Sequence, residues 1–354
     1  MFITGVGTAA PERRFAQAQC WIDVQGIPAF ERLGTRARAI IRKVLTGPSG
    51  IQTRHLALET LRDAFDLNPD SLHRRFLTTA PRLATTAARN ALREASVTVD
   101  EIDAIIISTC TGYLCPGLTS YVSEALGLRA NVLPLDLVGQ GCAAAIPNLR
   151  TADALLTSGR STRVLSICVE VCSAAFYLDD DPGVLISACL FGDGAGAAVL
   201  SNSPSNARPI EWVACHSVLD PAHRDLLRFE QAQGMLRNIL SPRVPALAAE
   251  YVERVLNEGL SDWKKERAEI AGWLIHPGGR DILKAISERL ALPEGALRCS
   301  AEVLSEFGNV SSPSLFFVLQ AALADSVKDG YWWMSSFGAG FTCHGALLKV
   351  GPPG

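Results

Sequence analysis

The sequence predicts an α/β protein built from two related halves. Apolar segments of strand length alternate with amphipathic segments of helix length, and the order of these segments recurs once along the chain. The 354 residues are 48% hydrophobic and 19% charged, so the chain can bury a substantial core, and intrinsic disorder is excluded. At roughly 150 residues per domain, this length fits two domains or two halves of one large core.

In the first half of the chain, the sequence predicts a series of helices and strands that ends in two strands. Residues 11–75 are the least regular part, with a helical patch at 36–45. After them, the apolar spacing predicts helix 79–95, strand 103–109, helix 118–126, a loop over 132–141, helix 142–156, and strands 163–171 and 196–200.

The second half repeats this order after a stretch of linker composition at residues 201–209. It predicts strand 271–275, turn 276–279, helix 280–290, a loop ending at 306–309, a helix reaching 323 and a strand near 331–335. The interval from Gly112 to Cys142 is 30 residues, and the interval from Gly278 to Asn309 is 31. We therefore expect one repeated unit with largely parallel sheets, in an N-terminal half at 1–205 and a C-terminal half at 206–354.

The charge and the cysteine content exclude several classes of protein. The 33 basic and 36 acidic residues give a net charge of −3, whereas nucleic-acid-binding domains usually carry a large positive excess. No apolar run approaches the length of about 18 residues that spans a membrane, and the first residues lack the layout of a secretory signal. The ten cysteines include no C-x-x-C pair, so we expect neither a metal site nor a dithiol site. The sequence predicts a reduced, cytoplasmic enzyme.

Three residues at predicted turns carry candidate chemistry, and each has a plainer alternative. Cys142 precedes an alanine-rich helix start, where free N–H groups and the helix dipole favour a thiolate; alternatively, it is a small residue at a tight turn. His276 ends an apolar strand before Pro-Gly-Gly and can pair with a thiol or donate to an oxyanion; alternatively, it is a core histidine bonded to a carbonyl. Asn309 lies at a helix start, where asparagine is also a favoured N-cap. Together, the three residue types at matched turns favour a catalytic site.

Five ordered motifs carry a resemblance to a known family: LVGQGCAAAIPN, FGDGAGAAV, HPGGRDIL, EFGNVSSPS and SFGAGF. Over about residues 50–350, the chain resembles the chalcone-synthase-like type III polyketide synthases of the thiolase superfamily. The resemblance implies a duplicated αβαβα layered core and a homodimer. It also implies that Cys142 is the nucleophile and that His276 and Asn309 complete a catalytic triad.

The resemblance further implies the residues of the substrate cavity. Phe191 matches the family's gatekeeping phenylalanine, and Cys115 matches a residue that reaches into the partner's cavity across the dimer interface. The positions implied to line the acyl cavity are Cys110, Thr111, Cys172, Ala175 and Ser311. For the positions other than Phe191 and Ser311, simple packing is the alternative.

Several residues differ from those at the matching positions of the plant enzymes, and these differences narrow the class of starter that is expected. Arg237 falls near the position of the second gatekeeping phenylalanine, with a local alignment that can slip by one residue. The basic residues that hold coenzyme A phosphates in plants have no clean match; Arg42, Lys43 and Arg280 are candidate replacements, with a solvated basic face as the alternative. The motifs most resemble bacterial alkylresorcinol and alkylpyrone synthases with long fatty-acyl starters. Acyl-coenzyme A and malonyl-coenzyme A would be substrates, and no cofactor is implied.

Other functions share parts of this pattern. A ketoacyl synthase III uses the same three residue types for a single condensation, but its histidine usually lies in a His-Gln-Ala-Asn-like motif, whereas His276 precedes Pro-Gly-Gly. A papain-like peptidase has its cysteine near the mature N-terminus in a different setting. A binding protein on the same fold would be expected to have a broken triad. The sequence therefore predicts an iterative acyltransferase, without fixing the starter, the number of extensions or the mode of cyclisation.

Overall fold

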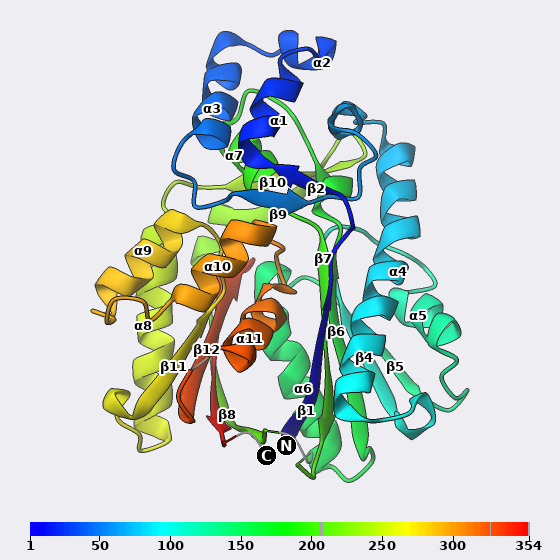
Figure 1. Cartoon of the computed structure of the whole chain (residues 1–354), viewed down its shortest axis with the longest axis vertical. Helices are drawn as coiled ribbons and strands as arrows, with labels where there is room; N and C mark the ends of the chain where they lie inside the picture. The colour runs from blue at the N-terminus through cyan, green and yellow to red at the C-terminus, as the bar shows by residue number, and fades with distance from the viewer. Residues whose placement is uncertain (205–207, 326, 353–354) are drawn as a thin grey trace.

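Five layers, in the order helix, sheet, helix, sheet, helix, make up the computed structural model, which describes residues 1–204, 208–325 and 327–352 (Figure 1). Within those residues, one nine-stranded sheet in the order β11-β12-β13-β8-β1-β7-β6-β4-β5 supplies both sheet layers. Its strands are β1 (Phe2–Ala9), β4 (Ala104–Ser108), β5 (Leu133–Leu137), β6 (Arg163–Glu170), β7 (Gly194–Ser201), β8 (Ile210–Leu219), β11 (Ile270–Ile275), β12 (Gly330–Gly338) and β13 (Thr342–Val350).

The strand order confirms the predicted duplication. The run β1-β7-β6-β4 of the first half recurs as β8-β13-β12-β11 in the second, and the two runs meet where Phe2 and Ile3 of β1 pair with Glu211 and Ile210 of β8. The sheet is mixed rather than largely parallel, since only β4–β5, β4–β6 and β11–β12 pair in parallel. Strands β12 and β13 are joined by a short turn, and such a connection permits only antiparallel pairing.

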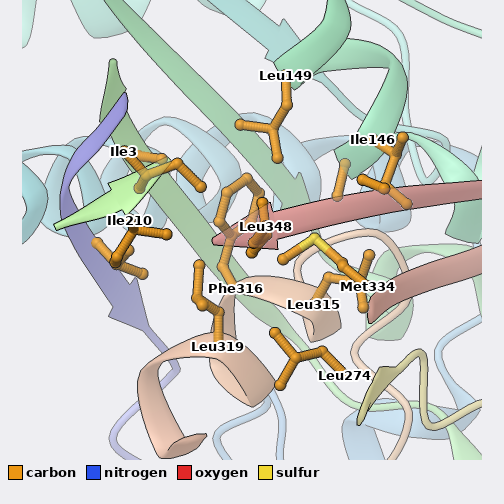
Figure 2. Close-up of a cluster of buried hydrophobic side chains, with 14 of the residues drawn as sticks. Ile3, Ile146, Leu149, Ile210, Leu274, Leu315, Phe316, Leu319, Met334 and Leu348 are labelled. Carbon is orange, nitrogen blue, oxygen red and sulfur yellow. The ribbon is translucent and has the colours of Figure 1, made fainter. Parts of the chain in front are cut away.

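The central helix layer consists of α6 (Ala145–Thr157) and α11 (Ser314–Ala324). Figure 2 shows Ile146 and Leu149 of α6 facing Phe316 of α11, with strand side chains from both sheet halves around them. Helix α11 is apolar on almost every side, which is the pattern of a helix buried between two layers.

The outer helices cover the other faces of the sheet halves. On one side lie α4 (Pro69–Ala95) and α5 (Leu118–Leu126), and on the other lie α8 (Val244–Asp262) and α9 (Arg280–Arg289) (Figure 1). The alternation along β4 shows how one strand serves two layers: Ile105 and Ile107 pack under α4, whereas Ile106 packs on the central layer.

A third group of elements gathers at one end of the layers (Figure 1). It comprises α1 (Gln17–Val24), α2 (Pro28–Glu31), α3 (Thr35–Thr46), α7 (Pro182–Leu190), the pair β2 (Arg14–Ala16) and β3 (Thr53–His55), and the hairpin β9 (Leu227–Ala232) and β10 (Met235–Leu240). Helix α10 (Arg298–Phe307) precedes the segment that leads to α11.

Three expected elements differ from the structure. The helix expected at 79–95 begins at Pro69, because Asn68 caps it by accepting hydrogen bonds from the N–H groups of Asp70 and Ser71. The segment 132–141 was expected to be a loop but contains the edge strand β5, which carries a proline and alternates in exposure. The loop expected before Asn309 contains α10, which buries Cys299, Val303 and Leu304 on one face. The expected boundary between residues 205 and 206 lies outside the described residues.

None of the helices within the described ranges is both long enough and apolar enough to cross a bilayer.

Close packing of β1 on α4 generates a stability prediction. A Cβ atom on Gly7 would lie 2.3 Å from the carbonyl oxygen of Ala87 and 2.4 Å from the nitrogen of Ala91. We expect Gly7→Ala to lower the free energy of unfolding by about 1–3 kcal/mol, because α4 must move away from the sheet. Urea denaturation measures the change. Gly26→Ala is the matched control, since a Cβ at Gly26 meets no atom within 4 Å, and equal stability of the two variants would contradict the prediction.

Candidate active site

Cys142 lies in a single 3-10 turn, Gly141–Ala143, between β5 and α6. Gly139 and Gly141 have φ values of 89° and 54°, a backbone conformation that glycine adopts most readily. The N–H groups of Ala143 and Ala144 donate to carbonyl oxygens of Gln140 and Gly141 within the turn. These two donors are therefore occupied, whereas the backbone N–H of Cys142 itself lowers the pKa of the thiol.

The Cys142 thiol contacts a hydroxyl from the other half of the chain. Its Sγ lies 3.2 Å from Ser311 Oγ. Ser311 has a φ of 57°, an uncommon value for a residue with a side chain, and its N–H donates to Asn309 Oδ1 at 2.8 Å. One strained turn thus places Ser311 against the thiol and fixes the Asn309 amide.

Asn309 also links this turn to the one that carries His276. Its Nδ2 donates to the carbonyl oxygen of Gly278 at 3.2 Å, two residues after His276. Asn309 lies five residues before α11, whose N-cap is Pro313, so it is not the helix cap that the sequence allowed. One of the two N–H groups on Nδ2 remains for another acceptor.

His276 follows directly on β11 and is fully buried. The backbone N–H of His276 donates to the carbonyl oxygen of Ser335. The imidazole ring packs edge-on against the ring of Phe337, with 5.2 Å between ring centroids. The next residues of β12 reach the cysteine turn, where Ser336 Oγ donates to the carbonyl oxygen of Ala143. Backbone and side-chain contacts therefore gather the turns of Cys142, His276 and Asn309 at one place.

Burial sets the ionisation of this site. It raises the pKa of the Cys142 thiol to about 12, against a smaller lowering by the Ser311 hydrogen bond. Burial also lowers the pKa of His276 to about 3, and Nδ1 of its ring has no hydrogen-bond partner among the described residues. Burial therefore favours the neutral thiol and the neutral imidazole in the unliganded site, and it opposes the thiolate that the sequence predicts.

Glu170, at the end of β6, is a residue that the sequence analysis did not single out. Its fully buried carboxylate accepts hydrogen bonds from the hydroxyls of Thr109, Thr111 and Ser312 at 3.2, 2.9 and 2.6 Å. The N–H and the Sγ of Cys110 donate to it at 3.0 and 3.3 Å. Burial raises the pKa of Glu170, and these hydrogen bonds lower it. The only signal in the sequence was a glutamate within an apolar strand.

A cavity of about 50 Å³ opens beside Cys142. Most of the implied cavity residues do line it, namely Cys110, Thr111, Cys172, Ala175, Phe191 and Ser311. A second cavity of about 400 Å³ lies between α4, the turn after β4 and the β9–β10 hairpin. Cys110 and Thr111 line both cavities, so they form a shared wall.

Phe191 and Asn309 are fixed by direct contact between the two halves of the chain. They form an isolated parallel bridge, in which the N–H of Gly192 donates to the carbonyl oxygen of Asn309 and the N–H of Asn309 to that of Leu190. The buried Arg54 guanidinium, which the sequence analysis missed, donates to the carbonyl oxygen of Phe191 at 2.9 Å.

Arg237, expected near the second gatekeeping position with a possible slip of one residue, does not line the cavity. Its guanidinium forms ion pairs with Asp179 at 2.7 Å and Glu230 at 2.9 Å. Side chains alternate along β10, and it is the next residue, Asn238, that lines the cavity. Cys115 is exposed and lies outside both cavity linings.

The candidate coenzyme A residues lie on two neighbouring elements. Arg42 and Lys43 are exposed on α3, and the Arg42 guanidinium lies 5.9 Å from the centre of the Trp21 ring. Arg280, at the start of α9, donates to the carbonyl oxygen of Pro48 just beyond the end of α3. Across residues 1–204, 208–325 and 327–352, no group of three or more His, Cys, Asp and Glu side chains is placed to hold a metal ion.

The site generates a prediction on thiol reactivity. Because the Cys142 pKa is near 12, its alkylation rate by iodoacetamide should still rise between pH 8 and pH 10 instead of levelling off near neutrality. In the native protein, the hydrogen bond from Ser311 lowers the pKa of the Cys142 thiol. Ser311→Ala removes this bond, so the pKa should rise and the profile should move to higher pH. Peptide mass spectrometry after timed alkylation measures the rate, with the same peptide of the urea-unfolded protein as the reference. A plateau below pH 7 would instead reveal a thiolate–imidazolium pair.

Comparisons with known proteins find relatives of both halves of the chain. Residues 31–204 match the N-terminal domain, and residues 227–352 the C-terminal domain, of the chalcone and stilbene synthases. A 1,3,6,8-tetrahydroxynaphthalene synthase of Streptomyces peucetius subsp. caesius is 30% identical over 98% of this chain and 92% of its own length.

Solved structures show the same fold. The polyketide synthase PKS-I of the brown alga Ectocarpus siliculosus superposes with a TM-score of 0.88 at 26% identity, over 98% of this chain and 97% of its own. The 1,3,6,8-tetrahydroxynaphthalene synthase of Streptomyces coelicolor A3(2), a bacterial type III polyketide synthase, gives a TM-score of 0.88 at 22% identity, over 99% and 100% of the two chains.

Proposed function

This chain belongs to the chalcone and stilbene synthase family of type III polyketide synthases, and we propose that it extends an acyl starter on Cys142 by repeated condensation with malonyl units. The observation that carries this proposal is the hydrogen-bonded path that starts at Cys142 and Ser311, in the lining of one cavity, and continues through Asn309 to the His276 turn.

Loading of the starter needs a thiolate, which burial disfavours in the unliganded site. When an acyl-coenzyme A thioester enters, the imidazole of His276 takes the proton of the Cys142 thiol as the Sγ attacks the carbonyl carbon. The bond between that carbon and the sulfur of coenzyme A breaks, and the leaving thiolate takes up the proton. If both partners start neutral, the pair of Cys142 and His276 adds no buried charge before the substrate arrives.

Decarboxylation uses the other two residues. As malonyl-coenzyme A loses carbon dioxide, the electron pair of the broken carbon–carbon bond moves onto the thioester oxygen. His276 and the free N–H of Asn309 donate to this enolate oxygen. The enolate carbon then attacks the acyl group on Cys142, and the thiolate leaves. Reloading of the product on Cys142 allows a further extension.

The two cavities support a long fatty-acyl starter. A volume of about 50 Å³ lies far below the roughly 300–1,000 Å³ typical of ligand pockets, whereas the second cavity adds about 400 Å³. The chain of the starter would pass the wall of Cys110 and Thr111 into the second cavity. The products would be alkylpyrones or alkylresorcinols after two or three extensions. The name of the Streptomyces peucetius relative points to a hydroxylated naphthalene as the alternative product.

The basic residues on α3 and at the start of α9 are the proposed binding site for the phosphates of coenzyme A. They are Arg42, Lys43 and Arg280. A homodimer would cover the edge strand β5 and the exposed residues Tyr113, Cys115 and Val138, and its mass in sedimentation would be twice that of the 37.9 kDa chain.

The triad proposal predicts separable defects. Cys142→Ala should abolish starter-dependent acyl-enzyme formation. Asn309→Ala should lose decarboxylation of malonyl-coenzyme A by about a hundredfold or more while still loading the starter, because the enolate loses a donor whereas Cys142 and His276, which carry the loading step, remain. His276→Ala should impair both steps. Mass spectrometry of the acyl-enzyme and release of labelled carbon dioxide measure the two steps. Normal decarboxylation by Asn309→Ala would show that Asn309 only shapes the turn.

The cavity proposal predicts the choice of starter. Each buried CH₂ contributes about 0.8 kcal/mol, so long acyl-coenzyme A esters should exceed coumaroyl-coenzyme A in kcat/KM. Ala175→Phe should shorten the longest accepted starter by filling the cavity, whereas Ala175→Ser should not. A panel of starters with malonyl-coenzyme A, analysed by product mass spectrometry, measures both effects. A preference for aromatic starters that Ala175→Phe leaves unchanged would contradict the long-chain proposal.

A further inference from the structure

A short loop after β12 forms part of the wall of the catalytic cavity. Residues 338–341, which we call the wall loop, lead from β12 into β13, and Ala339 lies in the cavity lining. The wall loop also packs closely on the turn that carries the catalytic thiol. A Cβ atom on Gly338 would lie 2.6 Å from the carbonyl oxygen of Gln140 and 2.7 Å from the nitrogen of Ala143. The position of the wall loop therefore bears on both the cavity and the cysteine turn.

The wall loop is anchored to a residue outside the cavity, Asp220. Two of the four residues of the loop are glycines, which leave its backbone with many accessible conformations. The N–H of Asp220 donates to the carbonyl oxygen of Phe341 at 2.9 Å, and the N–H of Phe341 donates to the carbonyl oxygen of Asp220 at 3.0 Å. Thr342 adds one hydrogen bond, from its Oγ1 to the carbonyl oxygen of Ala339 at 2.8 Å. The reciprocal pair with Asp220 is thus the main hydrogen-bonded link between the wall loop and the segment after β8.

The side chain of Asp220 is itself held in place by three groups. The hydroxyl of Tyr251, on α8, donates to Oδ2, and Nδ1 of His223 lies 2.9 Å from the same oxygen. The N–H of Ala222 donates to Oδ1 at 2.9 Å. The hydrogen bond from Tyr251 is the largest of the contacts that lower the pKa of Asp220. The carboxylate is therefore ionised at neutral pH, and hydrogen bonds to an ionised acceptor are stronger than those between neutral groups.

A row of ring contacts connects the same tyrosine with the catalytic histidine. The ring of Tyr251 lies 5.3 Å from that of Phe341, which stacks on Phe337 with 6.4 Å between centroids. Phe337 in turn meets His276 edge-on. Phe337 and Phe341 are both buried, and close-packed buried rings have little room to move independently. A shift of Phe341 would therefore also disturb the packing of the His276 imidazole.

We propose that Asp220 and Tyr251 are positioning residues that hold the wall loop against the Cys142 turn while the starter is transferred to the thiol. Neither residue lines either cavity, so neither touches the substrate. Attack by the thiol sulfur and transfer of its proton to His276 require both groups to be in place at once. A misplacement of about 1 Å can slow such a step by about a hundredfold. This inference rests on the proposed function and deepens it.

The test follows acyl-enzyme formation over time by quenched-flow mass spectrometry. One fatty-acyl-coenzyme A starter is used without malonyl-coenzyme A, so that the acyl-enzyme accumulates. In Tyr251→Phe the ring remains but the hydroxyl is lost, and the maximum rate constant should fall about three- to tenfold. The final amount of acyl-enzyme and the starter concentration at half the maximum rate should stay the same.

Two variants of Asp220 provide a graded comparison. Asp220→Ala removes the acceptor of all three groups and should lower the maximum rate constant by about ten- to a hundredfold. Asp220→Asn keeps a neutral acceptor for Tyr251 and should lie between Asp220→Ala and the unaltered enzyme. If Asp220→Ala does not fold, Tyr251→Phe and Asp220→Asn still carry the test. The matched control is Tyr331→Phe, which loses a hydroxyl at the opposite end of β12, outside both cavity linings, and should load at the normal rate.

The amount and the rate constant of acyl-enzyme formation separate positioning from simple stabilisation. A smaller amount of acyl-enzyme with an unchanged rate constant in Tyr251→Phe would show that the pair only stabilises the fold, and it would overturn the proposal. A change confined to the half-saturating starter concentration would also overturn it, because binding and not positioning would then be affected. Both results leave the proposed function intact. Absence of acyl-enzyme on Cys142 of the unaltered enzyme with every starter would instead overturn the proposed function itself.

Discussion

The buried carboxylate of Glu170 is the constraint on which the rest of the site depends. Burying a carboxylate without partners is highly unfavourable, and no cation pairs with this one in the described residues. It is satisfied instead by donors from the turn after β4 and from Ser312 in the segment before α11. The two halves of the chain must therefore meet at the end of β6. That meeting brings Ser311, the neighbour of Ser312, to Cys142.

The contact between the two halves of the chain also fixes the position of Asn309 and of the His276 turn. Asn309 is held through backbone hydrogen bonds to the segment 190–192 and through its side chain to the His276 turn. Arg54 adds hydrogen bonds to the carbonyl oxygens of Ala188 and Phe191. Most of these contacts are to backbone atoms, so the positions are set by the fold more than by particular neighbouring side chains. A preorganised site of this kind needs little rearrangement when an enolate forms.

Local pattern in the sequence was sufficient for much of the fold. Strongly apolar runs predicted β4, β6 and β11, and matched spacing predicted the duplication. Prediction from local pattern failed where the pattern is weak or where the structure depends on residues distant in sequence. Strand β5 has a proline and an acid in five residues, and only its pairing with β4 makes it a strand. At the corresponding place in the second half the chain forms α10, so the repeat itself did not reveal the difference.

The sequence by itself determined the layered α/β class, the repeated unit and the three turn residues Cys142, His276 and Asn309, because periodicity and turn chemistry are local properties. Only the tertiary structure decided that Asn238, not Arg237, faces the cavity, since a shift of one residue along a strand exchanges its faces. It likewise decided that Glu170 joins the halves and that burial raises the pKa of Cys142. Those properties depend on burial and on partners distant in sequence, and no local pattern encodes them.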